Sequence, residues 1–505
     1  MRQLLFVVLL GAVVACGDSS SPSQPDAPPP PMPDAPVEQP LVGCVNVAQV
    51  SNDMFATAAD FGELTPGSLA GWNPDGRWFL TGTRVGGVSS FHFEKRPGDI
   101  IVDRDQARPG TIDNDAIFHR LTFETQGRTV IIAKRVSNLL PDGSLRAERA
   151  SCDGEMCRVC TAKMVRAERH DPKVSDKLTL VGSLNGANWA RGFTFNVRVS
   201  GNTAYLVRID GLYIIDVTDP TTPVELGHYQ RTGDGYSNDV KIVDAAGGKR
   251  YALIADYPVD VIDVTNPAMP MLAAQIPEEA HTVFTETRNG STYAYMGNYD
   301  GSTPVFDVTN PAAPVRLGRY TTQGSLVHDL SVSNGIAYLN AWEAGLHIVD
   351  FTTPSAPVLK GQWQQTTART SHSNWTTTAA GRKIALHGDE AYGAHLDVVD
   401  IDPASPTYMK PFGSYKTRDH VSIHNIMAFG TKAYFTYYQD GVRVMDLADP
   451  ANPKLVGYYN TWDPQASYTS SAFFEGAVGL DVDLARKLIF VADSPRGLLI
   501  LRDDT

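Results

Sequence analysis

The sequence has few basic residues for its length and lacks a long hydrophobic run. Its 505 residues include 43 lysines and arginines against 56 aspartates and glutamates, which gives a formal net charge of −13. Binding to nucleic acid needs clustered basic side chains, so the acidic balance argues against DNA or RNA as a partner. The one apolar run, residues 4–14, is too short for a transmembrane helix, and we expect none.

Motifs of the common enzyme classes are also missing. The sequence has no phosphate-binding glycine loop, no Gly-x-Ser-x-Gly and no His-Glu-x-x-His. Cys157 and Cys160 have the spacing of a haem attachment motif, but Thr161 stands where that motif requires histidine. No reaction therefore follows from a motif, and the sequence leaves open whether the protein is an enzyme.

The N-terminus resembles the signal of an exported lipoprotein. Arg2 precedes the apolar run, and the run ends in Val-Val-Ala followed by Cys16, a pattern similar to a lipobox. We expect residues 1–15 to be a signal peptide and Cys16 to carry the lipid that anchors the protein to a membrane. The alternative is an ordinary signal peptide with a chance cysteine.

The segment that begins at Cys16 has the composition of a tether. Residues 16–41 are rich in proline and serine and have almost no apolar side chains, so burial cannot offset the entropy of ordering them. The prolines favour an extended, disordered chain that keeps the folded part away from the membrane.

Four cysteines remain after Cys16, namely Cys44, Cys152, Cys157 and Cys160. An even number in an exported chain indicates two disulfides, in any of three pairings. The spacing of the last three would also suit zinc with a fourth ligand. We favour disulfides because the expected compartment is oxidising.

A repeated motif dominates the second part of the chain. The segment GLYIIDVTDPTTP, residues 211–223, recurs with variation, and its last, degenerate copy is LLILRD at residues 498–503. The equivalent positions, 47, 44, 43, 50, 46 and 56 residues apart, are Asp216, Asp263, Asp307, Asp350, Asp400, Asp446 and Arg502. Periods in the forties are typical of four-stranded propeller blades. We therefore expect residues 171–505 to form a seven-bladed β-propeller.

Each repeat contains the same strands and the same turn. Short runs of valine, isoleucine and tyrosine are bounded by glycine, asparagine and proline, which favours strands joined by hairpins. The repeated aspartate stands where a strand ends and a Pro-x-x-Pro turn begins. We interpret it as a structural residue that accepts hydrogen bonds from the amides of the turn.

The last repeat stops after its third strand. Residues 177–184, KLTLVGSL, have the form of the missing fourth strand, as in residues 454–458. We expect this segment to complete the last blade and close the ring, which removes open sheet edges.

The motif (Leu/Val)-x-Ile-(Val/Ile)-Asp-Val-(Thr/Ser)-(Asp/Asn)-Pro-x-x-Pro resembles the LVIVD repeat of bacterial and archaeal surface proteins. The resemblance covers residues 178–505. The stretch from His424 through Gly441 to Tyr459 also resembles the choice-of-anchor B group of LVIVD proteins, named for their varied surface anchoring. These resemblances imply a propeller, an extracytoplasmic location and no settled activity.

Residues 42–170 lack the repeat and are expected to form a small β-rich domain. An antiparallel sandwich or a partly open barrel is predicted from strands at residues 77–83, 88–94, 119–124, 129–134, 144–150 and 159–165. Gly76-Arg77-Trp78 resembles the Gly-x-Trp signature of lipocalins, which would imply binding of a small ligand. We favour the alternative, a structural cap or spacer.

Histidines and carboxylates gather at one position of the repeat. The first strand of each blade lines the central channel of a propeller, so side chains at equivalent strand starts should converge at one mouth. The candidate ligands are His281, His328, His372, His424, Asp239, Asp329 and Glu475. Such a group would suit a divalent transition metal or general acid–base catalysis.

The alternative for these residues is structural. Histidine at a strand start can satisfy backbone groups beside the channel, and repeats copy such residues without chemical purpose. Weaker candidates in the same part of the chain, because they fall partly on other strands or loops, are His387, Glu390, His395 and His420.

Three functions are consistent with these features. The first choice is a cell-envelope lipoprotein, periplasmic or on the outer surface of the outer membrane, whose propeller binds a protein or a glycan. The second is a metal-dependent hydrolase or oxidoreductase with its site at the channel mouth. The third is a purely structural envelope protein. The metal content of the purified protein separates the second function from the others.

Overall fold

The chain divides into two compact units, Met1–Arg166 and Ala167–Thr505. The structure, a computed structural model, describes residues 43–81, 90–103, 108–125, 127–140, 142–189, 192–231, 237–365, 370–391, 393–419, 421–464 and 474–505. No helix in these ranges is long and apolar enough to cross a membrane. The expected signal peptide, Cys16 and tether lie outside the described residues, so the anchor stays a prediction.

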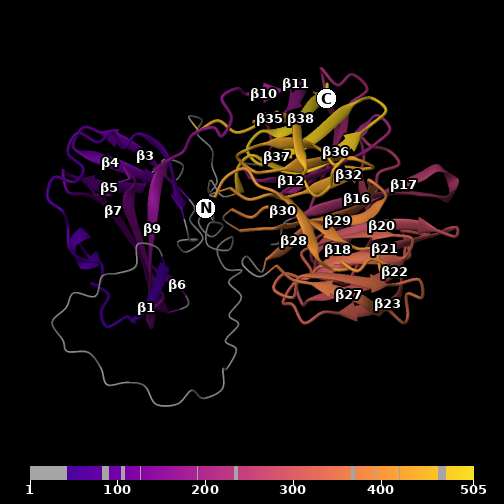
Figure 1. The fold of residues 1–505 in the computed structure, drawn as a ribbon, viewed down its shortest axis with the longest axis horizontal. Helices are drawn as coiled ribbons and strands as arrows, with labels where there is room; N and C mark the ends of the chain where they lie inside the picture. Colours follow the sequence, from indigo (N-terminus) through magenta and orange to yellow (C-terminus); the bar gives the residue numbers. More distant parts are fainter. Residues whose placement is uncertain are drawn as a thin grey trace, which may run out of the picture. The chain divides into compact units, whose positions relative to one another are not determined.

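The first unit is an antiparallel barrel (Figure 1). Its elements are β1 (Gly43–Ala48), η2 (Ala58–Phe61), β2 (Gly76–Thr81), β3 (Ser90–Arg96), β4 (Asp99–Asp103), β5 (Arg108–Ile112), β6 (Ala116–Thr125), β7 (Arg128–Leu139), β8 (Leu145–Cys152) and β9 (Met156–Arg166). Each strand from β2 to β8 pairs with the next along the chain, and β9 pairs with both β8 and β2. Eight strands therefore close on themselves, while β1 pairs with the other end of β9.

The barrel is more complete than the sequence predicts. All six expected strands are present, but β1, β4 and β5 were not expected. β5 has the sequence RPGTI, and its proline and glycine weaken the sequence signal for a strand. Trp78 of the Gly-Arg-Trp motif lies on β2, with the guanidinium of Arg166 at 4.3 Å from its ring centre. Ligand binding by the barrel stays untested.

Two disulfides join the four cysteines of the barrel. Cys44–Cys160 links β1 to β9, and Cys152–Cys157 joins the facing ends of β8 and β9. The expected disulfides are confirmed, and the zinc alternative for these residues is wrong because their sulfurs are bonded to each other. The pairing depends on β1 lying beside β9, which the sequence does not reveal.

The two disulfides should stabilise the barrel by different amounts. Their sequence separations are 116 and 5 residues. Because a crosslink removes loop entropy from the unfolded chain, breaking Cys44–Cys160 should lower the free energy of unfolding by about 5 kcal/mol, against about 2 kcal/mol for Cys152–Cys157. Urea unfolding of the two double Cys→Ala variants measures both losses. Equal losses would contradict this ordering.

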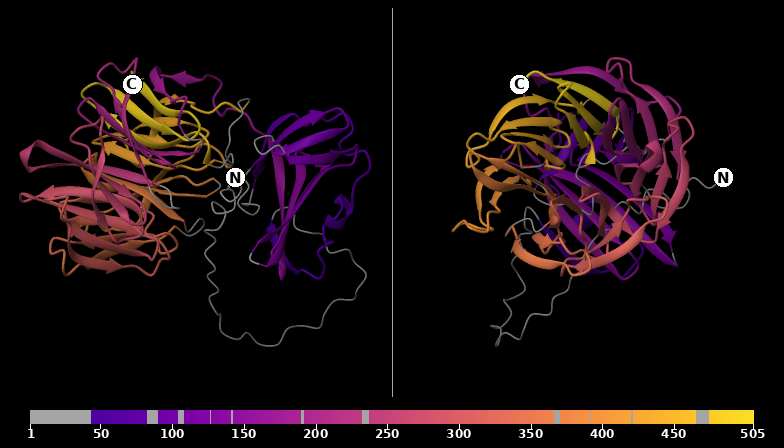
Figure 2. Two further views of the ribbon diagram at one scale, coloured as in Figure 1. Left: turned by 180° about the vertical axis from the view of Figure 1, so that it is seen from behind. Right: turned by 90° about the vertical axis from the view of Figure 1, so that its right-hand side faces the viewer.

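The second unit is a seven-bladed β-propeller, in which seven antiparallel sheets follow one another around a ring (Figure 2). From blade 1 to blade 7, the inner strands are β12 (Thr194–Ser200), β16 (Asp239–Ala245), β20 (Ala280–Arg288), β24 (Asp329–Ser333), β28 (Ser371–Ala379), β32 (Ile426–Phe429) and β36 (Ala477–Asp483). The second strands are β13 (Thr203–Arg208), β17 (Lys249–Ala255), β21 (Ser291–Asn298), β25 (Ile336–Asn340), β29 (Arg382–Asp389), β33 (Lys432–Thr436) and β37 (Leu488–Asp493). Neighbouring inner strands contact each other all the way round.

The outer half of each blade follows the same order. The third strands are β14 (Gly211–Asp216), β18 (Val259–Asp263), β22 (Ser302–Asp307), β26 (Leu346–Asp350), β30 (Leu396–Asp400), β34 (Val442–Asp446) and β38 (Gly497–Asp503). The outermost strands are β15 (Val224–Gln230), β19 (Met271–Ile276), β23 (Val315–Thr321), β27 (Val358–Trp363), β31 (Pro411–Tyr415), β35 (Lys454–Tyr459) and, in blade 7, β11 (Leu178–Leu184). A short turn, η4 (Ala246–Gly248), joins β16 to β17.

Ring closure follows the sequence prediction. β11 pairs antiparallel with β38, from Leu178 opposite Asp503 to Leu184 opposite Leu498, and so supplies the fourth strand of blade 7. The two-residue strand β10 (Ser175–Asp176) was not expected. It pairs with β35 and gives blade 6 a fifth strand.

The repeated aspartate has the structural role that its position predicts. In all six repeats its carboxylate accepts a hydrogen bond from the main-chain N–H two residues later, at 2.8–3.0 Å. Arg502 cannot accept such a bond, and Asp503 instead accepts one from the Thr505 N–H at 3.0 Å. The degenerate repeat thus keeps its turn by moving the carboxylate one residue along.

A glycine in the outermost strand lets neighbouring blades approach closely. A Cβ atom added to Gly318 would lie 2.0 Å from the carbonyl oxygen of Pro354, in the Pro-x-x-Pro turn of the next blade. Gly182 meets Pro220 of blade 1 in the same way, across the point where the ring closes. The Pro-x-x-Pro turn therefore also serves as a contact between blades, and Gly227 and Gly413 approach Pro267 and Pro450 in the same way.

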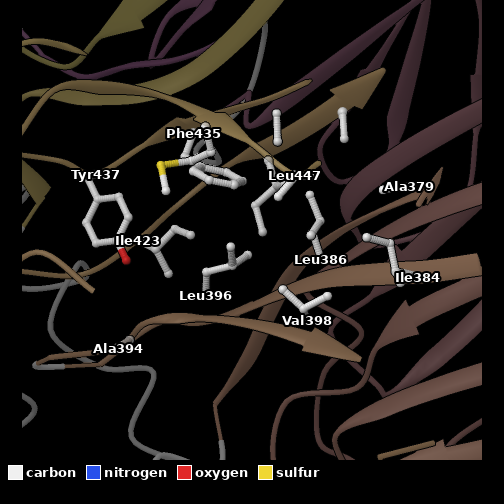
Figure 3. Close-up of a cluster of buried hydrophobic side chains, with 14 of the residues drawn as sticks. Ala379, Ile384, Leu386, Ala394, Leu396, Val398, Ile423, Phe435, Tyr437 and Leu447 are labelled. Carbon is white, nitrogen blue, oxygen red and sulfur yellow. The ribbon is translucent and has the colours of Figure 1, made fainter. Parts of the chain in front are cut away.

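Apolar side chains fill the space between neighbouring blades. Between blades 5 and 6, Leu386 and Leu396 pack in one cluster with Ile423 and Phe435, and all four are fully buried (Figure 3). This core holds β29 and β30 of blade 5 in place, and their ends carry the groups described below.

The closing strand should be essential for the stability of the propeller. A chain of residues 171–505 keeps β11, whereas residues 187–505 lack it and leave the edge of β38 unpaired. The shorter chain also loses the fully buried Leu178, which alone is expected to cost about 2–5 kcal/mol. Calorimetry should give a clearly lower Tm for 187–505. Equal melting of the two chains would show that β11 does not hold the ring.

Candidate functional site

The four candidate histidines form a continuous arc at the inner strands of blades 3 to 6. The ring centres are 3.9 Å apart for His281 and His328, 4.0 Å for His328 and His372, and 4.4 Å for His372 and His424. The structure thus brings these side chains together, and we call them the histidine arc. Their binding of metal stays a prediction.

Local irregularities of the strands place the histidines there. The β20–β21 pairing skips His281, and the β28–β29 pairing skips His372, so each is the extra residue of a β-bulge. Bulges re-aim side chains at the ends of strands. His328 precedes β24 directly, and His424 lies two residues before β32.

Two histidines of the arc donate to main-chain carbonyls of the next blade. His281 Nδ1 donates to the carbonyl of His328 and His424 Nδ1 to that of Val478, both at 2.8 Å. Asn238, at the equivalent place in blade 2, donates to the carbonyl of His281 at 2.8 Å. These bonds are what the structural interpretation predicts, and the side-chain nitrogen of Asn238 also lies 3.0 Å from Nε2 of His281.

Burial keeps the imidazoles of the arc neutral. It lowers the pKa of His281 to about 4 and lowers the pKa values of His372 and His424, because a charged imidazolium would lose its hydration. His372 has 1% of its surface exposed. Neutral imidazole is the form that binds metals.

A carboxylate at the end of β29 faces the arc. Glu390 Oε1 lies 4.0 Å from His372 Nε2 and accepts a hydrogen bond from the Tyr438 hydroxyl at 2.5 Å. One donor atom each of His328, His372 and Glu390 lie within 4.8 Å of one another. The sequence marks Glu390 as only a weaker candidate, because its contact with His372 depends on the fold of β29.

The other predicted carboxylates have different partners. Asp239 and Asp329 accept hydrogen bonds from the same Thr282 hydroxyl, at 2.8 and 3.2 Å. Glu475 accepts one from the Trp462 indole at 2.9 Å. Among the described residues, none of these three carboxylates belongs to a potential metal-binding group. His420 lies outside the described residues.

The part of the central channel beside Asp329 is nearly filled by side chains. A void of about 20 Å³ there is lined by Arg198, Lys241, Phe284 and Trp375, among others. Lys241 Nζ lies 2.6 Å from Asp239, so the charge is paired within the channel. Such a void holds about one water molecule.

The barrel unit has a larger hollow of its own. It measures about 430 Å³ and is lined by residues that include Trp72, Lys95, Ile112 and Asp113. If the barrel binds a small molecule, as the Gly-x-Trp resemblance implies, this hollow has room for it.

Comparison with known families identifies the repeats. The family described as LVIVD repeat matches residues 191–231, 234–276, 291–322, 324–365 and 424–461, which fall on blades 1, 2, 3, 4 and 6. This chain is an LVIVD-repeat β-propeller protein. Blade 5 of the LVIVD propeller lies outside the matched segments, and it is the blade that supplies both His372 and Glu390 to the mouth.

Several solved structures are similar to the LVIVD propeller at low sequence identity. U3-55K has 9% identity and a TM-score of 0.48, covering 65% of this chain and 98% of that one. A computationally designed protein, Ika8, has 11% identity and a TM-score of 0.44, covering 64% and 99%. BamB from Moraxella catarrhalis has 10% identity and a TM-score of 0.41, covering 64% and 97%. None of the curated proteins matches the chain.

Proposed function

We propose that the LVIVD propeller is a binding module of the cell envelope, and that the histidine arc with Glu390 is its site for a divalent transition metal. One observation carries the proposal, namely four imidazoles in mutual contact with a buried carboxylate beside them. In blade 2, the side-chain amide of Asn238 donates to the equivalent main-chain carbonyl, that of His281. A purely structural role therefore does not require four histidines in a row.

The hydrogen bonds of the arc favour metal binding. Metal-ligating histidines commonly donate one ring N–H to a backbone carbonyl, which fixes the tautomer and presents the other nitrogen to the metal. His281 and His424 have this arrangement through Nδ1. Several imidazole nitrogens and one carboxylate are a donor set suited to Zn²⁺ or Cu²⁺.

The envelope location rests on other features. The lipobox-like sequence before Cys16 and the proline-rich tether support an anchored lipoprotein, on the periplasmic or the outer face of the outer membrane. The two disulfides are consistent with an oxidising compartment. At the membrane surface, a metal held at the mouth would act as a contact for a protein or a glycan.

Zn²⁺ should bind at the arc and stabilise the folded protein. In chelator-treated protein, added Zn²⁺ should raise the Tm, and His328→Ala or His372→Ala should weaken its affinity on the order of 100-fold. Affinity should fall only well below pH 6.5, because burial lowers the pKa values of these imidazoles, that of His281 to about 4, and protonated imidazole cannot bind metal. The exposed His170 provides the control variant, His170→Ala, which should behave as wild type. If calorimetry and elemental analysis find neither Zn²⁺ nor Cu²⁺ in wild type, the arc is structural.

Cys16 should carry the membrane anchor. The Cys16→Ser variant lacks the thiol to which the lipid is attached, so it should leave the membrane fraction or remain unprocessed. Fractionation with labelling by a radioactive fatty acid distinguishes the two proteins. A variant that is still lipid-labelled and still in the membrane fraction would show that the anchor lies elsewhere.

A metal-dependent hydrolase or oxidoreductase at the same mouth is the alternative function. The hydrogen bond from Tyr438 to Glu390 favours it, because a phenol and a carboxylate beside a metal could move a proton. Screening the metal-loaded protein against ester, phosphate and redox substrates tests this function. Turnover that Tyr438→Phe abolishes without loss of metal would favour the enzyme over the binding module.

A further inference from the structure

Blade 5 contains a second group of potential metal ligands. His387 and Asp389 lie at the end of β29, and Asp397 lies near the start of β30, directly opposite His387 in the strand pairing. All three are buried, and one donor atom of each lies within 4.8 Å of the other two. The group shares no residue with the histidine arc.

Neighbouring side chains hold His387 in one orientation. Its Nε2 is hydrogen-bonded to the Ser371 hydroxyl at 2.8 Å, and the ring of Trp363 stands perpendicular to it with centres 5.0 Å apart. This leaves Nδ1 as the free nitrogen. Nδ1 is buried and has no hydrogen-bond partner among the described residues. Burial also lowers the pKa of His387, which keeps the imidazole neutral.

The carboxylates are positioned in the same manner. The Thr370 N–H donates to Asp389 Oδ1 at 2.8 Å, and His395 Nε2 lies 3.2 Å from Asp397 Oδ1. Asp397 Oδ2 is buried and, within the part of the chain that the structure describes, has no hydrogen-bond partner. A buried nitrogen and a buried oxygen without hydrogen-bond partners destabilise the folded protein, unless a ligand satisfies both.

The charge of the group also calls for a cation. In the described ranges, neither Asp389 nor Asp397 forms an ion pair with lysine or arginine. The basic side chain beside them is His395, whose Nε2 lies 3.2 Å from Asp397 Oδ1 and whose side chain is 29% exposed. Burying two carboxylates without a lysine, an arginine or a metal ion to balance their charge costs free energy of folding.

We propose that His387, Asp389 and Asp397 form a second metal site, specific for a divalent transition metal and distinct from the histidine arc. One imidazole with two carboxylates is a harder donor set than the arc, so it suits Mn²⁺ and Fe²⁺ as well as Zn²⁺. Ser371 orients the imidazole, and His395 orients Asp397 from the exposed side. Such contacts behind the ligands are usual in protein metal sites.

Three variants test this site separately from the arc. Asp397→Asn keeps the volume of the side chain and removes a ligand, and Asp389→Asn repeats the test if the first variant does not fold. His328→Ala changes the arc alone. The control is His347→Gln, because His347 is a buried histidine of β26 that contacts Tyr320 and belongs to neither group.

Full-length, chelator-treated protein is titrated with Mn²⁺ and Zn²⁺ in a calorimeter, and metal is counted after dialysis. Wild type and His347→Gln should bind one Mn²⁺ and two Zn²⁺. Asp397→Asn should bind Mn²⁺ on the order of 100-fold more weakly and keep one Zn²⁺. His328→Ala should keep Mn²⁺ binding and lose one Zn²⁺.

The results separate this site from the arc. A folded Asp397→Asn variant that binds Mn²⁺ and Zn²⁺ like wild type would overturn the second site. So would the loss of all bound metal in His328→Ala, which would leave the arc as the one site. Loss of metal in Asp397→Asn alone, with none lost in His328→Ala, would support the second site and count against the arc.

Discussion

Seven sheets can share one channel only when the ring that they form is closed, and in this chain β11 makes the closing contact with β38. The contact joins a strand that precedes blade 1 to the last strand of the chain, so the position of every blade depends on it. Close packing then fixes the blades against one another, as the approach of the Gly182 main chain to the Pro220 carbonyl illustrates at the point of closure. The inner strand starts of blades 3 to 6 meet because of this constraint, and the histidine arc is a consequence of it.

Repetition explains why these blades bring similar groups to the mouth. The residue at the start of an inner strand lies next to a main-chain carbonyl of the following blade, which needs a donor. Asn238, His281 and His424 each supply one. Histidine differs from asparagine in having a second nitrogen after the first has donated. When several repeats have histidine at this position for a structural reason, their second ring nitrogens also lie close together at the mouth.

Much of this fold is readable from the sequence because it depends on local, repeated signals. The period of the motif predicts the blades, the missing fourth strand predicts closure, and strand starts predict the arc. Features that depend on contacts between distant segments are not readable in the same way. Cys44 pairs with Cys160 only because β1 lies beside β9, and Glu390 reaches His372 only because β29 ends beside the mouth. Asp389 and Asp397 have equivalents in blade 2, Asp256 and Asp260, but only blade 5 places a histidine, His387, beside such a pair.

The structural and the metal-binding interpretations of the arc do not exclude each other. Nδ1 of His281 serves the backbone, and the same bond orients Nε2 as it would in a metal site. What distinguishes blade 5 is that it adds carboxylates. The end of β29 directs Asp389 toward His387 and the next residue, Glu390, toward His372. Adjacent residues of an extended chain point to opposite sides, so one strand end can serve two groups of ligands.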